Sequence, residues 1–438
     1  MNVDLIIAVS IFIIFIGSVI VYLVNISAEG PQWSKLVEMK KTAVDFVNEI
    51  ISRGDPESWE KEKIIPSTIG LASSYYVIPF LILENSGYDR LNEAVTLVVN
   101  FDSECIGLVW NESLRIYDEN FNEVPFKFVH QDFCNSGYLK SSILFLEINI
   151  SANSSRTFQL FFSNSSSIKM KDYGSFSNLV LWLTFDDVFR NMTLDYSGNK
   201  NNGFLYDANS TNSDGETPPI LVDGKFGKAL SFDGLDDYVE VLHSPSLDSS
   251  NYTINLWVKV NSLEGRASGI ISKNSEDGIL SQTVYGIFTS EAENNLRFRS
   301  GTNSKNISYT DLENFHMLTF VVVNSGLSRV YLDSNLVASF TDNRISGDKP
   351  LQIGRSKFTW KAEYFNGTID EVRIYNRALT SEEINSLYRG PLQVFIFPKK
   401  EVNLISFEKM KNLKEIDYNL LKDIVKKGYN FRVEVYEK

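Results

Sequence analysis

The chain has 438 residues, enough for two to four domains, and a net charge of −13. This acidic balance excludes functions that need a basic surface, nucleic-acid binding above all. The three histidines, His130, His243 and His316, lie far apart and lack ligand spacing, which excludes a Cys/His metal site.

The first element in the chain is an apolar segment at residues 5–24, interrupted only by two serines, a glycine and a tyrosine. Twenty helical residues span about 30 Å, which is the thickness of the hydrocarbon layer. No Lys or Arg precedes the segment, and it is longer than the apolar core of a cleaved signal peptide. We therefore predict a transmembrane anchor at residues 1–24.

An amphipathic helix is predicted next, at residues 33–52, where apolar residues recur at helical spacing between Lys and Glu. At the other end of the chain, Asp417 is placed to cap a helix that Gly428 ends, between strand candidates at 392–397 and 429–436.

These two ends resemble archaeal type IV pilin-like proteins. The similarity lies in Asp4 before the apolar run, the helix, Ile69-Gly70-Leu71, and the closing Gly428-Tyr-Asn-Phe with its last strand. The resemblance implies that residues 25–76 and 391–438 form one split α+β base domain. The modules between them are then insertions, which a loop with neighbouring ends accommodates at low cost.

Residues 77–170 predict a β-sandwich, because runs of β-forming residues alternate with Asn, Ser, Gly and Asp breaks. The runs are 76–83, 94–101, 114–117, 144–150 and 156–162. Both cysteines, Cys105 and Cys134, lie in this segment. A disulfide between them and two small buried thiols are the alternatives.

Residues 176–390 show a second set of β patterns. Two short strands flank Asp233-Gly234 within 229–241, and apolar residues alternate at 253–260. Thr380 and Glu383 have the spacing of a capping box, so we expect a short helix there.

Together with Leu179–Asp186, Gly224–Ala229 and Phe365–Leu379, these stretches resemble, in order, the laminin-G-like branch of the concanavalin A-like jelly rolls. The predicted fold is therefore mainly β, with an N-terminal transmembrane helix, a small α+β base domain, a β-sandwich and a concanavalin A-like jelly roll. This fold serves sugar binding, protein binding and catalysis alike, so it does not by itself assign a function.

The resemblance also implies a structural calcium ion, because related jelly rolls place acidic ligands near the first strand and in the last. The matching residues are Asp186 and Asp370, with Asp195 as a further candidate. Calcium takes six to eight oxygen ligands. The alternative is that Asp186 and Asp370 cap turns or pair with Arg373 and Arg377.

Sugar binding would require exposed aromatic faces with polar neighbours. Tyr285, Phe358, Trp360 and Tyr364 lie in or beside predicted loops and are the candidates for ligand contact. Trp257 belongs to a regularly alternating strand, and we expect it in the core.

No catalytic residues are expected. The glycosidases of this fold use a Glu-x-Asp-x-Glu strand, and no such strand is found. Asp186-Asp187 and Asp236-Asp237 are adjacent pairs, and adjacent strand residues point to opposite faces. A glycosidase needs two carboxyl groups that face one cleft.

We therefore expect a cell-membrane protein with a single span and its body outside the cell, which binds an extracellular glycan or a surface protein without catalysis. Ten Asn-x-Ser/Thr sequons favour an exported glycoprotein. Two alternatives stay open. One is a minor pilin or filament-tip subunit, and the other is a glycoside hydrolase or its accessory carbohydrate-binding module.

Overall fold

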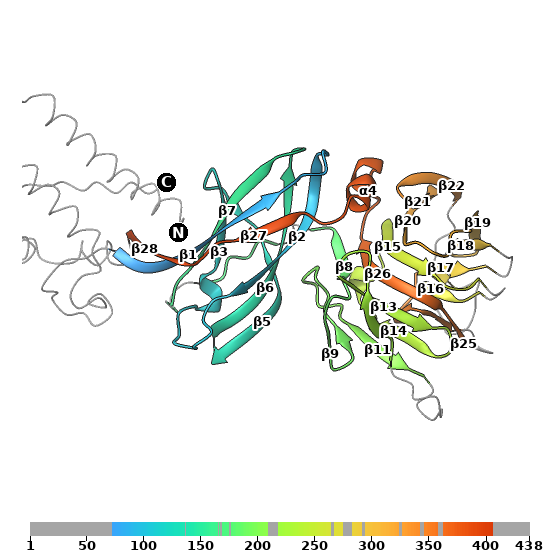
Figure 1. The fold of residues 1–438 in the computed structure, drawn as a ribbon, viewed down its shortest axis with the longest axis horizontal. Helices are drawn as coiled ribbons and strands as arrows, with labels where there is room; N and C mark the ends of the chain where they lie inside the picture. Colours follow the sequence, from blue (N-terminus) through green and yellow to red (C-terminus); the bar gives the residue numbers. More distant parts are fainter. Residues whose placement is uncertain are drawn as a thin grey trace, which may run out of the picture.

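The computed structural model describes residues 72–405 except for short segments at 136, 165, 167–168, 175–176, 209–217, 264–266, 275–282, 291–293, 324–325, 342–345 and 358–361. The predicted anchor and most of the predicted base domain lie outside the described residues. Within the described range, no helix is long and apolar enough to cross a membrane. The described chain is mainly β and forms two modules side by side (Figure 1).

The first module consists of two facing antiparallel sheets. One sheet has three strands, in the order β2 (Arg90–Asn100), β6 (Tyr138–Ile150) and β5 (Lys127–Asn135). The other follows the order β27 (Gln393–Ile396), β1 (Ala72–Leu83), β7 (Ser155–Phe162), β3 (Arg115–Asp118) and β4 (Glu123–Val124), with β28 (Lys400–Ile405) also paired to β1. A single 3-10 turn, η1 (Asn111–Ser113), precedes β3.

The core of this module follows from alternation along the strands. In β1, Ile78, Phe80 and Ile82 are buried and pack against Phe158 and Leu160 of β7. Every second side chain of a strand faces the same side, so one face of each sheet is apolar and the two apolar faces meet.

The last described strands extend this module. β28 pairs with residues 72–77 and β27 with residues 80–83, so both lie along the one continuous strand β1. The boundary that the sequence suggests at residue 76 therefore falls inside β1. Ala72 and Ile405 are direct partners, which places the two ends of the described chain together.

The second module is a sandwich of two larger antiparallel sheets. The first sheet has nine strands, in the order β19 (Asn303–Ser308), β18 (Asn295–Ser300), β17 (Thr283–Thr289), β16 (Gly269–Asn274), β23 (Leu351–Ile353), β14 (Asp237–Val241), β11 (Gly203–Asp207), β10 (Met192–Thr193) and β9 (Val188–Phe189). The second has eight, in the order β12 (Ile220–Asp223), β13 (Lys228–Asp233), β26 (Asn366–Tyr375), β15 (Tyr252–Val260), β20 (His316–Val322), β21 (Leu327–Leu332) and β22 (Asn335–Thr341), with β8 (Leu179–Leu183) beside β26.

Three smaller elements complete this module. A hairpin joins β24 (Arg355–Lys357) to β25 (Ala362–Tyr364), and the 3-10 turn η2 (Pro245–Leu247) precedes β15. Helix α4 (Ser381–Tyr388) begins at Thr380, whose side chain accepts a hydrogen bond from the Glu383 N–H, while the Glu383 side chain binds the Thr380 N–H. The capping box that the sequence predicts is thus present.

The two modules share a buried interface. The outer face of the eight-stranded sheet and α4 pack against β2 and β6 of the first module (Figure 1). Ala94 and Phe145 of the first module lie in one apolar cluster with Trp182, Trp257 and Leu387 of the second. Trp257 is therefore in a core, as its strand pattern predicts.

A buried arginine connects the modules at this interface. Arg90 is 2% exposed, and its guanidinium donates to the carbonyl oxygens of Ser386 at 2.8 Å and Gly390 at 3.0 Å. It also faces the carboxylates of Glu84 at 3.4 Å and Glu93 at 3.6 Å. Since a buried charge is tolerated only when it is paired, this network fixes how the modules sit together.

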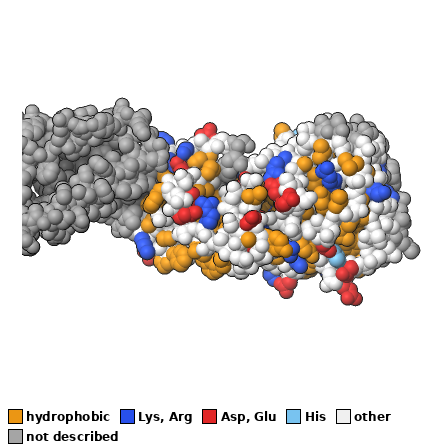
Figure 2. All heavy atoms as spheres, turned by 90° about the horizontal axis from the view of Figure 1, so that it is seen from above, with side chains coloured by type: hydrophobic (Ala, Val, Ile, Leu, Met, Phe, Trp, Pro, Cys, Tyr) orange, Lys and Arg blue, Asp and Glu red, His pale blue; other side chains and the backbone are white. Residues whose placement is uncertain are grey.

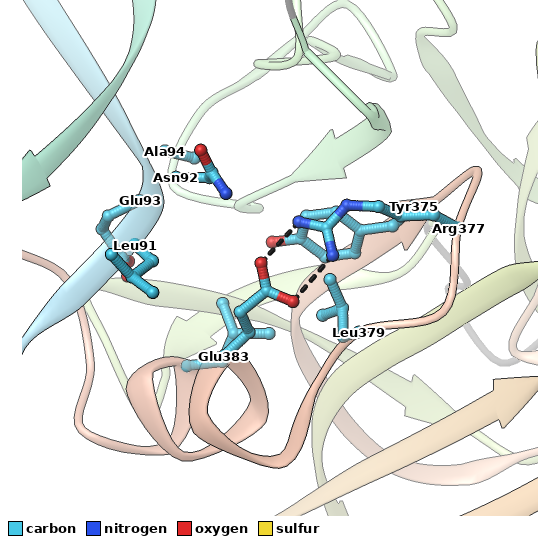
Figure 3. Close-up of a pocket in the computed structure, with 9 residues that line it drawn as sticks. Leu91, Asn92, Glu93, Ala94, Tyr375, Arg377, Leu379 and Glu383 are labelled. Atoms are coloured by element: carbon cyan, nitrogen blue, oxygen red, sulfur yellow. Dashed lines mark hydrogen bonds and ion pairs between the residues drawn. The ribbon is translucent and has the colours of Figure 1, made fainter.

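The interface is closely packed. A cavity of about 10 Å³ lies between β2 and α4, which is room for roughly one water molecule. Figure 3 shows the residues that line it. The ion pair between Arg377 and Glu383, at 2.6 Å, lies on one side of it. A cavity of this size is too small for a sugar, so we do not assign a ligand to it.

A disulfide joins Cys105 to Cys134 in the first module, across a sequence separation of 29. Such a cross-link restricts the unfolded chain, and a loop of this length stabilises a domain by roughly 3 to 4 kcal/mol. We expect reductant to lower the free energy of unfolding by about that amount in urea titrations. The Cys105→Ser/Cys134→Ser variant, which reductant cannot change, is the control. Coincident curves for the oxidised and reduced wild-type chain would contradict the expectation.

Acid should weaken the module through Glu84. Burial alone raises the pKa of this carboxyl, but hydrogen bonds from the Ser86 side chain and the N–H groups of Asn153, Ser86 and Gly87 outweigh burial and lower the pKa from 4.5 to about 2. A lowered pKa stabilises the folded state above pH 4.5, and this stabilisation is lost as the pH falls towards 2.

The Glu84→Gln variant should therefore be less stable near neutral pH and lose less stability on acidification than the wild-type chain. Unfolding midpoints measured across this pH range test the prediction. Glu104→Gln, at an exposed carboxylate of the same module, is the matched control. Parallel pH profiles for Glu84→Gln and wild type would rule out this role for Glu84.

Candidate functional site

Strand β26 places two adjacent carboxylates on the same face of its sheet. Ile369 and Val372 both point into the core between the sheets. Asp370 and Glu371, which lie between them, both point outward, because β26 is irregular here and Glu371 has a φ of 53°. A bulge of this kind lets consecutive side chains share one face.

Asp370 and Asp186 converge on one turn, at residues 224–228. One oxygen of Asp370 accepts hydrogen bonds from the N–H groups of Lys225 at 2.8 Å and Phe226 at 3.0 Å. Asp186, just after β8, accepts one from the N–H of Lys228 at 2.8 Å. The structure therefore brings together two of the three predicted metal ligands, around a turn that the sequence resemblance includes.

The close approach requires glycines. A Cβ on Gly224 would lie 2.6 Å from an Asp370 oxygen, and a Cβ on Gly227 would lie 2.0 Å from an Asp186 oxygen. Gly227 also has a φ of 60°, which side-chain-bearing residues rarely adopt. The Gly-Lys-Phe-Gly sequence of this turn thus makes room for both carboxylates.

Among the described residues, neither Asp186 nor Asp370 forms an ion pair with a lysine or arginine, although the Arg373 charge acts on Asp370 from a distance. Burial, together with the charges of Glu371 and Asp186, raises the pKa of Asp370 to about 8, although two backbone N–H groups act in the other direction. Burial also raises the pKa of Asp186. The second oxygen of Asp370, Oδ1, is buried without a hydrogen-bond partner. An oxygen-only site with an unpaired buried carboxylate oxygen fits a calcium ion.

Asp195, the third candidate ligand, is held by backbone N–H groups in the loop after β10. Its carboxylate accepts hydrogen bonds from the N–H groups of Trp182 at 2.9 Å, Ser197 at 3.0 Å and Asn201 at 2.9 Å. These bonds engage both oxygens and hold the loop after β10 against β8. Both oxygens of Asp195 therefore accept hydrogen bonds from backbone N–H groups of this loop and of β8.

The four aromatic residues predicted to contact a ligand lie in different environments. Tyr285 is fully buried in the core between the sheets, tilted against Tyr252 with ring centroids 4.7 Å apart, so its assignment as a surface contact is wrong. Tyr364 is half-buried in β25, where its backbone partner is Arg355 of β24. Phe358 and Trp360 lie outside the described residues.

An aromatic surface that the sequence did not reveal lies on the outer face of the nine-stranded sheet. Tyr206 of β11 and Tyr238 of β14 are stacked, with ring centroids 5.0 Å apart. The Arg355 guanidinium lies 3.4 Å from the centre of the Tyr238 ring, on the side of β23. Tyr238 is therefore flanked on both sides, and Tyr206, which is 40% exposed, presents a free ring surface.

Polar groups border these rings. The amide nitrogen of Gln352 donates to Glu240 at 2.6 Å, and the amide oxygen accepts from the Arg355 Nε at 2.7 Å. Arg355 and Glu240 are also 3.7 Å apart. We define Tyr206, Tyr238, Glu240, Gln352 and Arg355 as the tyrosine face.

The alternation of residues in β14 could have revealed part of this face from the sequence. Tyr238 and Glu240 alternate with Val239 and Val241, whose side chains are fully buried. The alternation places Tyr238 and Glu240 on the outer side. Arg355 could not be found in this way, because it reaches the face from the hairpin after β23.

Comparisons with known proteins bear on the second module. Residues 232–385 match the family model Laminin_G_3, described as the concanavalin A-like lectin/glucanases superfamily. No curated protein matches the chain.

Two solved structures are similar in part. Domain 4 of AbnA, a GH43 extracellular arabinanase from Geobacillus stearothermophilus, solved with arabinotriose, is 22% identical with a TM-score of 0.38, over 48% of this chain and 98% of that one. The binding domain of Paraclostridial Mosquitocidal Protein 1 is 20% identical with a TM-score of 0.37, over 48% of this chain and 52% of that one. The family match and the two facing sheets confirm that residues 232–385 belong to a concanavalin A-like jelly-roll domain.

Proposed function

We propose that this chain is a glycan-binding protein of the cell surface, anchored by its N-terminal segment, and that the tyrosine face is its sugar site. The exposed ring of Tyr206 beside a hydrogen-bonded set of polar side chains carries the proposal. The match to a family that includes lectins supports it. The anchor, the exported body and the pilin-like base are proposed from the sequence alone.

The geometry of the face suits a sugar ring. The C–H side of a pyranose or furanose packs on an aromatic surface, and the hydroxyl groups at its rim need donors and acceptors. Tyr206 supplies the surface, while Glu240 and Arg355 supply an acceptor and donors next to it. The stacking of Arg355 on Tyr238 fixes the ring that supports Tyr206.

The same face favours binding over hydrolysis. Glu240 is held by the Gln352 amide and faces the Arg355 guanidinium, which keeps its charge engaged. Hydrolysis of a glycoside needs an acid and a second carboxylate across the scissile bond. We therefore propose no catalysis, and hydrolysis of a polysaccharide by the purified chain would contradict this part of the proposal.

Calcium is proposed as a structural ion at Asp186 and Asp370. A bound cation would pair with both carboxylates, which have no ion-pair partner among the described residues, and would tie the first strand β8 to the last strand β26 through the turn at 224–228. The site lies beside the module interface rather than on the tyrosine face, so its proposed role is to stabilise the fold.

The first experiment is a glycan array with the full chain, run with calcium and again with chelator. We expect binding, and we expect Tyr206→Ala to weaken it roughly twofold to tenfold, because a stacked ring contributes about 0.5–1.5 kcal/mol. Titration calorimetry with the best glycan measures the change.

Tyr88→Ala is the matched control for this experiment. Tyr88 is 39% exposed on the first module and also carries a stacked arginine, Arg389, at 4.1 Å. Its loss should leave glycan affinity unchanged. An absence of glycan binding by the folded chain, or equal losses for both variants, would argue against a sugar site on the tyrosine face and for a protein partner.

Removal of calcium should lower the thermal stability of the second module. At a calcium concentration about 100 times the Kd, one bound ion adds roughly 2.7 kcal/mol, or about 5 °C or more in Tm. Asp370→Asn keeps the shape of the side chain and should reduce this calcium-dependent rise, while Asp132→Asn, at an exposed site of the first module, should not. The same rise in all three proteins would refute the assignment.

A further inference from the structure

The turn between β13 and β14 gathers three carboxylates that the proposed function does not use. Asp233 is exposed, and Asp236 and Asp237 are buried. One oxygen from each lies within 4.8 Å of the others. We define these three residues as the Asp233 turn.

The turn is built by a glycine between two sheets. Gly234 has a φ of 86°, which allows the chain to leave β13 in one sheet and enter β14 in the other within four residues. The backbone of Asp237 pairs with Asp207 of β11, so a fourth acidic residue lies across the ladder. The acidic side chains are therefore held together by the fold and not by one another.

The carboxylate of Asp237 is buried and is hydrogen-bonded to the protein through only one of its oxygens. Its side chain is 95% buried, since the residue is 5% exposed, and only one of its oxygens has a partner, the N–H of Asp233 at 3.1 Å. The other oxygen, Oδ1, is buried without one. A buried carboxylate oxygen with no donor costs about 1–3 kcal/mol or more, because it has lost its water.

No side chain of the described residues compensates this charge at Asp237. Neither Asp233 nor Asp237 forms an ion pair with a lysine or arginine in that part of the chain. A bound cation would therefore be the counter-charge that Asp233 and Asp237 lack among the described residues.

We propose that the Asp233 turn binds a divalent cation, and that calcium is the ion its ligands fit. Its donors are all carboxylate oxygens, which suit calcium or magnesium and not zinc or copper. Calcium–oxygen distances are about 2.3–2.6 Å, so oxygens on one ion lie at most about 5 Å apart, in agreement with the observed limit of 4.8 Å. The exposed position of Asp233 leaves room for water ligands, which calcium accepts in irregular arrangements.

This site is separate from the one at Asp186 and Asp370. The turn that holds Asp186 and Asp370 precedes β13 at Lys228, and the Asp233 turn follows the same strand at Asp233. Five residues of strand place them roughly 16 Å apart, too far to share an ion. The inference therefore does not depend on the proposed calcium at Asp370.

Calcium titration of the chelator-treated full chain by calorimetry tests the inference. We expect Asp237→Asn to bind one calcium ion fewer than the wild-type chain and to keep the ion at Asp370. Asp370→Asn should show the reverse loss, and the double variant should bind neither ion. The matched control is Asp132→Asn, at an exposed aspartate of the first module, and it should bind as wild type does.

A second measurement separates loss of a site from loss of the fold. Without calcium, Asp237→Asn should unfold at the same or a higher temperature than wild type, because it removes an uncompensated buried charge. With calcium, it should gain less stability. Unchanged calcium stoichiometry in a folded Asp237→Asn variant would overturn the inference, as would a wild-type chain whose only calcium ion disappears in Asp370→Asn. Loss of an ion in Asp237→Asn alone would support the inference while refuting the proposed ion at Asp370.

Discussion

The architecture depends on strand β26 and on the burial of charge along its outer face. Its inward residues Ile369, Val372 and Ile374 fill the core of the jelly roll. Its outward Glu371 accepts hydrogen bonds from Trp182 at 2.9 Å and Arg373 at 2.7 Å, on the face that the first module covers. Glu371 and Arg373 are buried as an ion pair, so strand β26 and the module interface are coupled through one row of residues.

The sequence predicts those elements whose apolar residues recur at the period of a strand or whose ends carry a capping motif. The alternation at 253–260 and the capping box at Thr380 correspond to β15 and α4. The polar strand β5 was missed, because it has no fully buried residue. Tyr285 was misplaced because every residue of β17 is buried, so neither of its faces is polar and alternation gives no signal.

The acidic residues show where sequence reasoning reaches its limit. Strand alternation predicts that neighbouring carboxylates point apart, and this led us to set aside Asp236-Asp237 as a cooperating pair. The rule holds only in regular strands. A bulge puts Asp370 and Glu371 on one face, and the turn at Gly234 brings Asp233 back towards Asp237. Both irregularities depend on tertiary pairing, which a single sequence does not display.

The packing of the modules determines which surface of the jelly roll can bind a ligand. The outer face of the eight-stranded sheet is occupied by α4 and the first module, whereas the tyrosine face belongs to the other sheet. In Figure 2, acidic, basic and apolar side chains are interspersed on the viewed face of both modules. Because Ala72 pairs with Ile405 at the end of the first module, the described chain enters and leaves at one place, and the jelly roll lies at the opposite end (Figure 1). A chain attached through these ends would therefore present the tyrosine face away from its attachment.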